Sequence, residues 1–263
     1  MSLRFSIRKM ILPVLSALLM LFPGAFFAQD DDPAAISSSE DLFYGTPSIP
    51  DQLLTRKGFS IGYSKKERQA IWVCYILTSD NLDLPKVARS NIFLPDPLVE
   101  KPVHPRDYRK TGYDKGHLAP AADFTYSEET MRNSFYMSNI SPQVPGCNRG
   151  IWKRLEQQVR NWARREERIC VITGPIFSPE DKSMKDTGIR IPCAFYKVIL
   201  DTTPPQKMIG FIIPNETTKK RLGSFIVTVD EVEKATGCDF FSGLPDEQEE
   251  KLESSAIPSE WGL

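Results

Sequence analysis

Histidine is the scarcest side chain in this sequence that could take up a proton near neutral pH. The 263 residues contain only two, His104 and His117. Because histidine is the usual general base near neutral pH, a histidine-based reaction must use one of them. His104 lies in a proline-rich segment, residues 102–105, which indicates a structural or solvent-exposed side chain. His117 is therefore the candidate base.

The neighbours of His117 favour chemistry on a phosphate group. Residues 113–120 read Tyr-Asp-Lys-Gly-His-Leu-Ala-Pro. Gly116 removes a side chain beside the histidine, so we predict that a bulky substrate can approach there. Lys115 places a cation two residues away, which suits a phosphate, and Asp114 could orient the local turn. The alternative is a structural histidine in a polar turn.

A second group of candidates lies downstream, in residues 138–143 (Ser-Asn-Ile-Ser-Pro-Gln) and 148–156 (Asn-Arg-Gly-Ile-Trp-Lys-Arg-Leu-Glu). Asn148 stands at the start of a predicted helix, where its side chain could cap the helix. It could instead bind a hard cation, since Mg²⁺ typically takes one or two protein oxygens and keeps several waters. Glu156 and Arg160 could form an i,i+4 ion pair or act at such a site.

Taken together, these segments resemble the DNA/RNA non-specific endonuclease family, the endonuclease G-like group with a ββα-metal (His-Me finger) motif. The resemblance runs from about Phe59 to Ile213 and is strongest from Arg89 to Arg160. It implies a Mg²⁺-dependent endonuclease that hydrolyses phosphodiester bonds in DNA and RNA and leaves 5′-phosphates. Mn²⁺ could replace Mg²⁺, because a site with few protein oxygens and many waters takes either.

The resemblance also implies a role for each candidate at the metal. His117 would accept the proton of the attacking water. Asn148 would be the direct Mg²⁺ ligand, and Glu156 would orient or hold the metal-bound waters. The bound metal would stabilise the leaving 3′ oxygen.

Four further residues receive roles around the phosphate from the same resemblance. Arg89 would contact the scissile phosphate, Asn139 would hold the histidine loop, and Arg160 would support Glu156 or the phosphate. Lys115 departs from the family's usual Asp-Arg-Gly-His motif. Lysine keeps the charge but loses the bidentate fork of arginine, so we expect activity to survive with a weaker grip on phosphate.

The elements that must position these residues can be predicted from local patterns. Short segments rich in β-branched and aromatic residues predict strands at residues 59–63, 70–77, 135–137, 169–173, 194–200 and 208–213. Turns or irregular loops separate most of them, which favours an α+β fold: a single domain whose mixed, mainly antiparallel central sheet is flanked by helices.

Two helices are predicted. The longer covers residues 149–167, with an apolar stripe of Ile151, Leu155, Val159 and Trp162. The shorter covers residues 229–236. Thr228 followed by Glu231 forms a capping box at its start, and Gly237 ends it.

The two ends of the chain differ from the middle. Residues 1–28 combine a positive start with a short apolar run, which predicts a secretory signal and an exported protein, periplasmic or secreted. The alternative is a single membrane anchor. Residues 29–51 predict a flexible acidic leader, residues 52–243 the endonuclease domain, and residues 244–263 a peripheral acidic tail.

The charge and the cysteines constrain the partners. Without the predicted signal, 30 basic residues face 34 acidic ones, so binding to DNA and RNA must come from a local basic patch. Segment 101–115 and the long helix could supply it through contacts to phosphate and sugar. We expect no membrane partner after signal cleavage, and a homodimer is compatible with the family. The cysteine count of five leaves at least one unpaired in a monomer, and Cys147 is either in a disulfide or a buried thiol.

Two rival functions remain at this stage. Residues 58–62, Gly-Phe-Ser-Ile-Gly, match the GxSxG elbow of serine hydrolases, with Ser60 as nucleophile. That elbow requires a strand, a sharp turn and then a helix, whereas polar residues and another predicted strand follow here. The other rival is a nuclease-like protein that binds nucleic acid, or an inhibitor, without cleaving.

Overall fold

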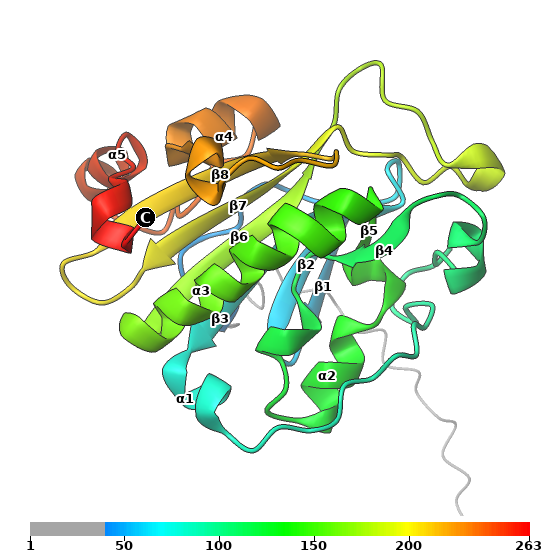
Figure 1. Ribbon diagram of the computed structural model, residues 1–263, viewed down its shortest axis with the longest axis horizontal. Coiled ribbons are helices and arrows are strands. Elements are labelled where there is room, and N and C mark those ends of the chain that lie inside the picture. Colours follow the sequence, from blue (N-terminus) through cyan, green and yellow to red (C-terminus); the bar gives the residue numbers. More distant parts are fainter. Residues whose placement is uncertain (1–39) are drawn as a thin grey trace, which may run out of the picture. The chain divides into compact units, whose positions relative to one another are not determined.

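The computed structural model describes residues 40–263 (Figure 1). The predicted signal, residues 1–28, and most of the predicted leader lie outside the described residues. Seven strands form one sheet in the order β1-β2-β3-β6-β7-β8-β9, and β4 and β5 form a separate pair. Every strand pair is antiparallel. The predicted α+β fold with a mainly antiparallel sheet is therefore confirmed.

The strands of the described residues are β1 Gln52–Arg56, β2 Phe59–Ser64, β3 Gln69–Thr78, β4 Asp114–His117, β5 Ile140–Gln143, β6 Arg168–Ile176, β7 Ala194–Asp201, β8 Lys207–Pro214 and β9 Ile226–Val227. Five of them, β2, β3, β6, β7 and β8, match predicted segments, whereas β1, β4, β5 and β9 were not predicted. The strand predicted at residues 135–137 is wrong. Phe135 caps a helix, Tyr136 forms a single bridge to Leu94, and a 3₁₀ turn starts at Met137.

The helices are α1 Ser79–Asp83, α2 Glu128–Ser134, α3 Lys153–Arg165, α4 Val229–Thr236 and α5 Asp246–Glu253. The predicted bounds of α4 are confirmed. The Thr228 hydroxyl accepts from Glu231 N (3.2 Å), and Gly237 ends the helix at φ +72°. By contrast, α3 begins later than predicted, because a π-helical turn, Cys147–Trp152, precedes it. Such π turns are frequent at functional sites.

Alternation along the strands gives the sheet two apolar faces, each covered by a helical layer. On β6, Ile169 and Val171 pack with the apolar stripe of α3, whereas Cys170 and Ile172 pack with α4 on the other face. Figure 1 shows α3 lying across one face of the sheet while α4 lies beyond β8. The side chain of Trp162 on α3 is fully buried; burying a large apolar side chain stabilises a fold by about 1.5–3 kcal/mol.

Both ends of the described chain belong to the packed structure, which corrects two expectations. Leu42 is buried, and Trp72 Nε1 donates to Ser48 O at 3.2 Å, so residues 40–51 are not a flexible leader. Trp261 is fully buried, and its carbonyl oxygen accepts from Trp162 Nε1 at 2.7 Å. The predicted tail is thus not peripheral. A few apolar residues anchor segments whose average composition is acidic.

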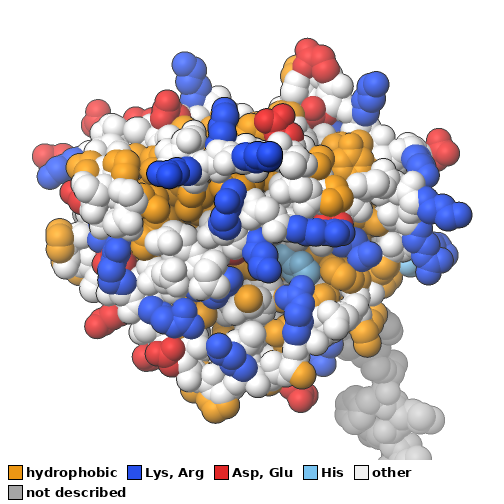
Figure 2. All heavy atoms as spheres, viewed as in Figure 1, with side chains coloured by type: hydrophobic (Ala, Val, Ile, Leu, Met, Phe, Trp, Pro, Cys, Tyr) orange, Lys and Arg blue, Asp and Glu red, His pale blue; other side chains and the backbone are white. Residues whose placement is uncertain are grey.

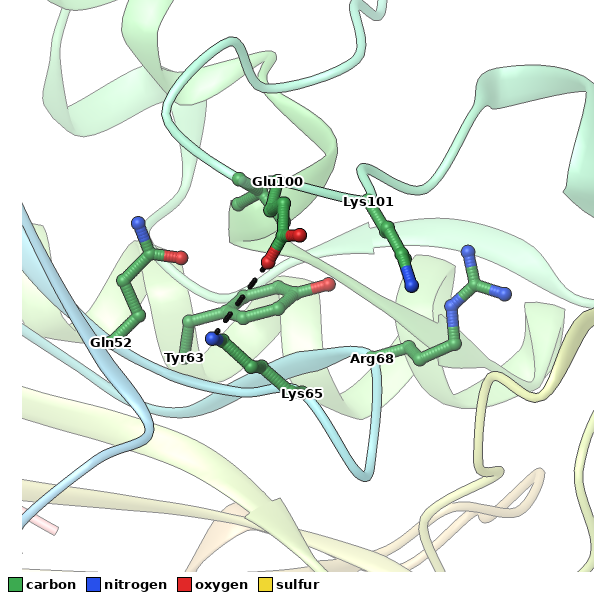
Figure 3. A pocket seen from close by; sticks show the side chains of 7 residues that line it. Gln52, Tyr63, Lys65, Arg68, Glu100 and Lys101 are labelled. Atoms are coloured by element: carbon green, nitrogen blue, oxygen red, sulfur yellow. Dashed lines mark ion pairs between the residues drawn. The ribbon is translucent and has the colours of Figure 1, made fainter.

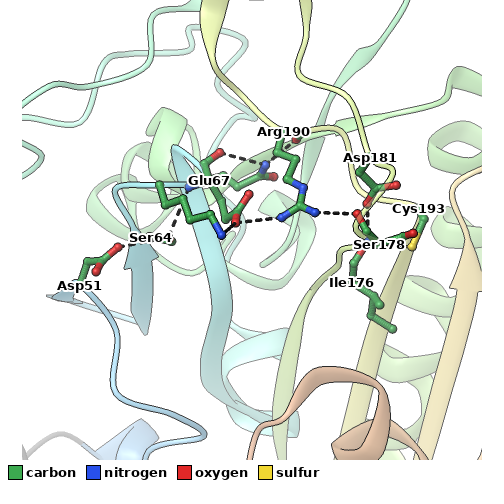
Figure 4. A network of polar contacts seen from close by, with 10 residues as sticks. Asp51, Ser64, Glu67, Ile176, Ser178, Asp181, Arg190 and Cys193 are labelled. Atoms are coloured by element: carbon green, nitrogen blue, oxygen red, sulfur yellow. Dashed lines mark hydrogen bonds and ion pairs between the residues drawn. The ribbon is translucent and has the colours of Figure 1, made fainter.

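A polar network joins two connections at one end of strands β2, β3 and β6 (Figure 4). Arg190, in the loop between β6 and β7, donates to Glu67 Oε1 at 3.0 Å and to Ser178 O at 2.6 Å. Glu67 lies in the turn between β2 and β3, and its backbone nitrogen donates to Ser64 Oγ. The long β6–β7 loop is thereby held against the β2–β3 turn.

All five cysteines lie within the described range, and all are free thiols. Of the two alternatives for Cys147, the structure shows the buried thiol. Cys74 and Cys170 lie on adjacent strands with their sulfur atoms 3.9 Å apart. Between residues 40 and 263, no helix has the length and apolar character needed to cross a membrane.

Candidate active site

His117 is the last residue of β4, and its position is set by pairing with β5. It faces Ile140 across the pair, and Gly116 faces Ser141. Gly116 is buried, and a Cβ placed on it would lie 2.2 Å from Cδ of Gln143. The predicted reason for this glycine is therefore wrong. It makes room for a neighbouring side chain rather than for substrate.

Asn139 holds the chain that follows His117. Its Nδ2 donates to Ala119 O and Ser134 O, and its Oδ1 accepts from Ala119 N, each at 2.9 Å. Its backbone oxygen also accepts from Leu118 N at 3.0 Å. Asn139 is fully buried. These bonds are the contacts that a residue holding the histidine loop requires.

The His117 ring packs against two aromatic rings that also contact each other. The ring centroids of Phe135 and Phe93 are 4.8 and 5.5 Å from that of the imidazole. Nε2 is buried and has no hydrogen-bond partner within residues 40–263. Burial, aided by the charge of Arg89, lowers the pKa of His117 to about 3. The imidazole is therefore neutral near pH 7 and can accept a proton.

Asn148 lies in the π turn and is tied to the histidine strand through Asp114. Its Nδ2 donates to Asp114 Oδ2 at 2.9 Å. Arg149 donates to the same carboxylate from Nε (2.7 Å) and Nη2 (2.6 Å). Burial alone would raise the pKa of Asp114, but the hydrogen bonds from Arg149 and Asn148 outweigh burial and lower this pKa. The side chain of Asn148 caps neither the π turn nor α3, so the capping alternative is not what the structure shows.

Glu156 and Arg160 lie on α3 but do not pair with each other. Arg160 Nη1 lies 2.8 Å from Asp123 Oδ1, and Tyr75 donates to Asp123 Oδ2 at 3.0 Å. Within the described residues Glu156 has no ion pair at all. Burial raises the pKa of Glu156 to about 7, while the charges of Lys197 and Arg160 oppose the rise.

Lys197 is a functional candidate that the sequence did not reveal. It lies in the middle of β7 and is fully buried. Its Nζ has no hydrogen-bond partner in residues 40–263 and sits 5.0 Å from the centroid of the Trp152 ring. The only signal was a single lysine inside the apolar segment 194–200. Buried lysines are rare without a partner, which makes this cation next to Glu156 notable.

One cleft of about 590 Å³ brings most of the predicted residues together. Its lining includes six of the seven predicted site residues, Arg89, Lys115, His117, Asn148, Glu156 and Arg160. Arg89 lies over the Phe135 ring at 5.2 Å, and Lys115 Nζ over the Phe93 ring at 4.9 Å. Figure 2 shows Lys and Arg side chains gathered around a histidine on this face. Asn139 lies behind the cleft.

Part of the predicted basic surface lines the cleft and the hollow beside it. An adjoining hollow continues from Arg149 and Lys153 to Arg154 and Lys219. From the predicted segment 101–115, Lys115 is the basic residue that lines the cleft. Two arginines of α3 form ion pairs with acidic residues: Arg164 pairs with Asp83, and Arg165 pairs with Glu166.

A separate hollow of about 370 Å³ lies at the β1–β2 edge (Figure 3). Lys65, Arg68 and Lys101 line it, and Lys65 faces Glu100 at 4.0 Å. Its lining, as the described residues form it, contains no histidine that could act as a general base. The hydrolytic chemistry is therefore not expected there.

The serine hydrolase alternative does not fit the structure. Ser60 is fully buried inside β2, between the paired strands β1 and β3. A nucleophile elbow needs its serine exposed at a sharp turn between a strand and a helix. Neither feature is present at Ser60.

The sequence profile of the DNA/RNA non-specific endonuclease family matches residues 38–247. The chain belongs to this family. Nuclease C1 of Cunninghamella echinulata is 35% identical over 226 residues, covering 79% of this chain and 90% of that one. Bovine mitochondrial endonuclease G is 31% identical over 254 residues, covering 90% and 82%.

A solved structure of a family member shows the same fold. The crystal structure titled as the EndoG/EndoGI complex aligns with a TM-score of 0.72 at 27% identity, covering 79% of this chain and 92% of that chain. The sequence resemblance to the non-specific endonuclease family is thus confirmed. The family and its nuclease members indicate a hydrolytic enzyme that acts on nucleic acids.

The prediction of an exported protein is corrected by these relatives. Those from Saccharomyces cerevisiae, Bos taurus, Homo sapiens and Schizosaccharomyces pombe are named as mitochondrial nucleases. A positive start without acidic residues is common to mitochondrial targeting segments and secretory signals. The composition of residues 1–28 therefore does not separate the two destinations.

Proposed function

We propose that this non-specific endonuclease is Mg²⁺-dependent, cleaves both DNA and RNA, and leaves 5′-phosphates. The proposal rests on one observation. The buried Nε2 of His117 has no hydrogen-bond partner among residues 40–263, and it lies in the cleft that Asn148 and Glu156 also line. A neutral imidazole, an amide and a carboxylate around one cleft are the groups that metal-assisted phosphodiester hydrolysis requires.

The residues present fit a hard cation. The Nδ2 of Asn148 is engaged with Asp114, so its Oδ1 is the amide atom left to bind a metal. Glu156 lines the same cleft without an ion pair among the described residues and would hold the metal-bound waters. Mn²⁺ would suit the same oxygen donors. When bound, the cation supplies positive charge that stabilises the leaving 3′ oxygen.

His117 acts as the base in this proposal. It takes a proton from the attacking water through Nε2, and the Phe93 and Phe135 rings keep the imidazole from turning away. Arg89 lies over the Phe135 ring and Lys115 over the Phe93 ring, and in this proposal both bind the scissile phosphate. Arg160, held by Asp123, adds charge behind Glu156.

The composition of the cleft explains broad specificity. Its charged lining is mainly Lys and Arg, and the adjoining hollow extends that basic surface. Cations of this kind contact phosphate and sugar, which DNA and RNA share, and such contacts carry no sequence information. We also propose that the chain can form a homodimer. Sedimentation of the purified chain would measure its oligomeric state.

The test is cleavage of plasmid DNA and of RNA by the purified chain, with Mg²⁺ and with EDTA. We expect degradation of both substrates in Mg²⁺ and its loss in EDTA, in His117→Ala and in Asn148→Ala. His104→Ala is the matched control, because it removes the other histidine outside the cleft. Binding without cleavage by the wild type would instead identify a nucleic-acid-binding protein.

A further inference from the structure

A cluster of acidic side chains joins α4 to α5, away from the cleft. Asp230 and Glu233 belong to α4, and Glu253 is the last residue of α5. One carboxylate oxygen from each lies within 4.8 Å of the others. The two helices lie near each other at one end of the fold in Figure 1. Like charges this close repel, so either protonation or a bound cation must offset them.

Glu253 is the most demanding member of the cluster. It is only 5% exposed, and its Oε1 is buried without a hydrogen-bond partner in the described part of the chain. It also stands at the C-terminus of a helix, where the helix dipole disfavours a negative charge. A buried carboxylate is normally paired, hydrogen-bonded or bound to a metal. Here burial, the helix end and the neighbouring acids all oppose it.

The surrounding residues supply little compensation. None of the ion pairs found between residues 40 and 263 involves Asp230, Glu233 or Glu253. Glu233 accepts from Phe240 N through Oε1 at 2.7 Å, which fixes that side chain and leaves its second oxygen available. Glu249, one turn before Glu253, also has a buried oxygen without a hydrogen-bond partner in the described residues.

We propose that Asp230, Glu233 and Glu253 bind one Ca²⁺, which links α4 to α5. All three donors are carboxylate oxygens, which hard cations prefer. Mg²⁺ usually binds one or two carboxylates and keeps several waters, whereas Ca²⁺ accepts more protein oxygens in a flexible geometry, so three carboxylates favour Ca²⁺. The three oxygens lie within 4.8 Å of one another, close enough for one ion to contact them all.

The effect of this ion would be on stability rather than on catalysis. The chain continues from α5 to Trp261, whose carbonyl oxygen accepts from Trp162 on α3. Fixing α5 against α4 would therefore also hold the segment that packs behind the catalytic helix. The site shares no residue with the proposed Mg²⁺ site, so the two can be tested separately.

The experiment uses the full chain carrying Asn148→Ala, which removes the proposed catalytic metal ligand. Calorimetric titration with CaCl₂ is expected to show one Ca²⁺ per chain. Saturating Ca²⁺, about 100-fold above Kd, is expected to raise Tm by about 5–10 °C over EDTA. Glu253→Gln and Asp230→Asn are each expected to abolish both effects. Glu250→Gln, an exposed position on the same helix, is the control and should change neither.

Absence of Ca²⁺ uptake, or uptake that persists in Glu253→Gln, would overturn the proposal. An equal Tm increase with MgCl₂ at the same concentration would overturn the assignment to Ca²⁺. In EDTA, Glu253→Gln is expected to have a Tm at least equal to that of the parent, because glutamine has a similar shape and cannot carry the charge that burial and the neighbouring acids disfavour. That result also shows that the variant folds, so its loss of Ca²⁺ binding reports on the site.

Discussion

The amide of Asn148 donates to the carboxylate of Asp114 at 2.9 Å. The first residue of β4 thereby fixes the orientation of a side chain that comes 34 positions later. Groups that orient a metal ligand typically contribute 10–100-fold to metal affinity or activity. We expect Asp114→Ala to raise the Mg²⁺ concentration needed for half-maximal cleavage by about that factor. Asp114→Asn keeps a hydrogen-bond acceptor, so its Mg²⁺ requirement should lie between those of wild type and Asp114→Ala. An unchanged Mg²⁺ dependence in Asp114→Ala would contradict this role.

Lys197 is expected to support Glu156 from inside the fold. Replacing it by Met keeps the apolar packing against Trp152 but removes the buried cation. Lys197 Nζ has no hydrogen-bond partner among residues 40–263, so its removal relieves the cost of burying an unsatisfied cation. We therefore expect little change in Tm, with cleavage reduced about 10-fold or more. The effect should be much smaller when Glu156→Gln is already present, because the two residues act together. Full activity in Lys197→Met would show that the lysine is a bystander.

The environment of His117 predicts how stability depends on pH. The unfolded histidine titrates near its ordinary value of 6.5, whereas the folded one has a pKa of about 3. Between these values the unfolded chain binds more protons, so this residue lowers the stability of the fold as pH falls below 6.5. The slope approaches about 1.4 kcal/mol per pH unit. Urea unfolding of wild type and His117→Gln from pH 7.5 to pH 5 measures it, and equal slopes would refute the prediction.

Gly116 gives a prediction about packing. A methyl group at this position would lie 2.2 Å from the side chain of Gln143, so Gly116→Ala must displace that buried side chain. Overpacking of this kind costs about 1–3 kcal/mol. The double variant Gly116→Ala/Gln143→Ala should recover part of that loss, and urea denaturation of the three variants would show it. A single variant as stable as wild type would mean that Gln143 moves aside freely.

The thiols give a prediction about reactivity. Cys193 is exposed, whereas Cys147 is buried and burial raises its pKa to about 11. Thiolates, not thiols, react with disulfide reagents, so Cys147 should remain unmodified at pH 8 in the native protein. We expect Cys193 to be labelled first and all five thiols to be labelled after unfolding. Mass spectrometry of digested, labelled protein identifies the positions.

Local signals predicted much of the fold, because they depend on neighbours in the sequence. Thr228, Glu231 and Gly237 mark both ends of α4 within ten residues. The strand at residues 135–137 was mispredicted for the same reason. An apolar triplet satisfies the strand pattern, but α2 ends there and leaves a turn.

The missing parts of the site depend on contacts between distant segments. The hydrogen bond from Asn148 to Asp114 and the position of Lys197 beside Trp152 arise only when β4, β7 and the π turn before α3 come together. Arg160 shows the limit most clearly. Its spacing from Glu156 permits an ion pair within the helix. Instead, Arg160 pairs with the buried carboxylate of Asp123, which lies in a 3₁₀ turn distant in the sequence.

All five cysteines are reduced thiols, which determines the conditions in which this protein can fold. None of the contacts among residues 40–263 depends on an oxidation step. The chain can therefore complete its fold where glutathione keeps thiols reduced. Recovery from denaturant should need only a reducing buffer, with no oxidant and no isomerase to sort mispaired bridges.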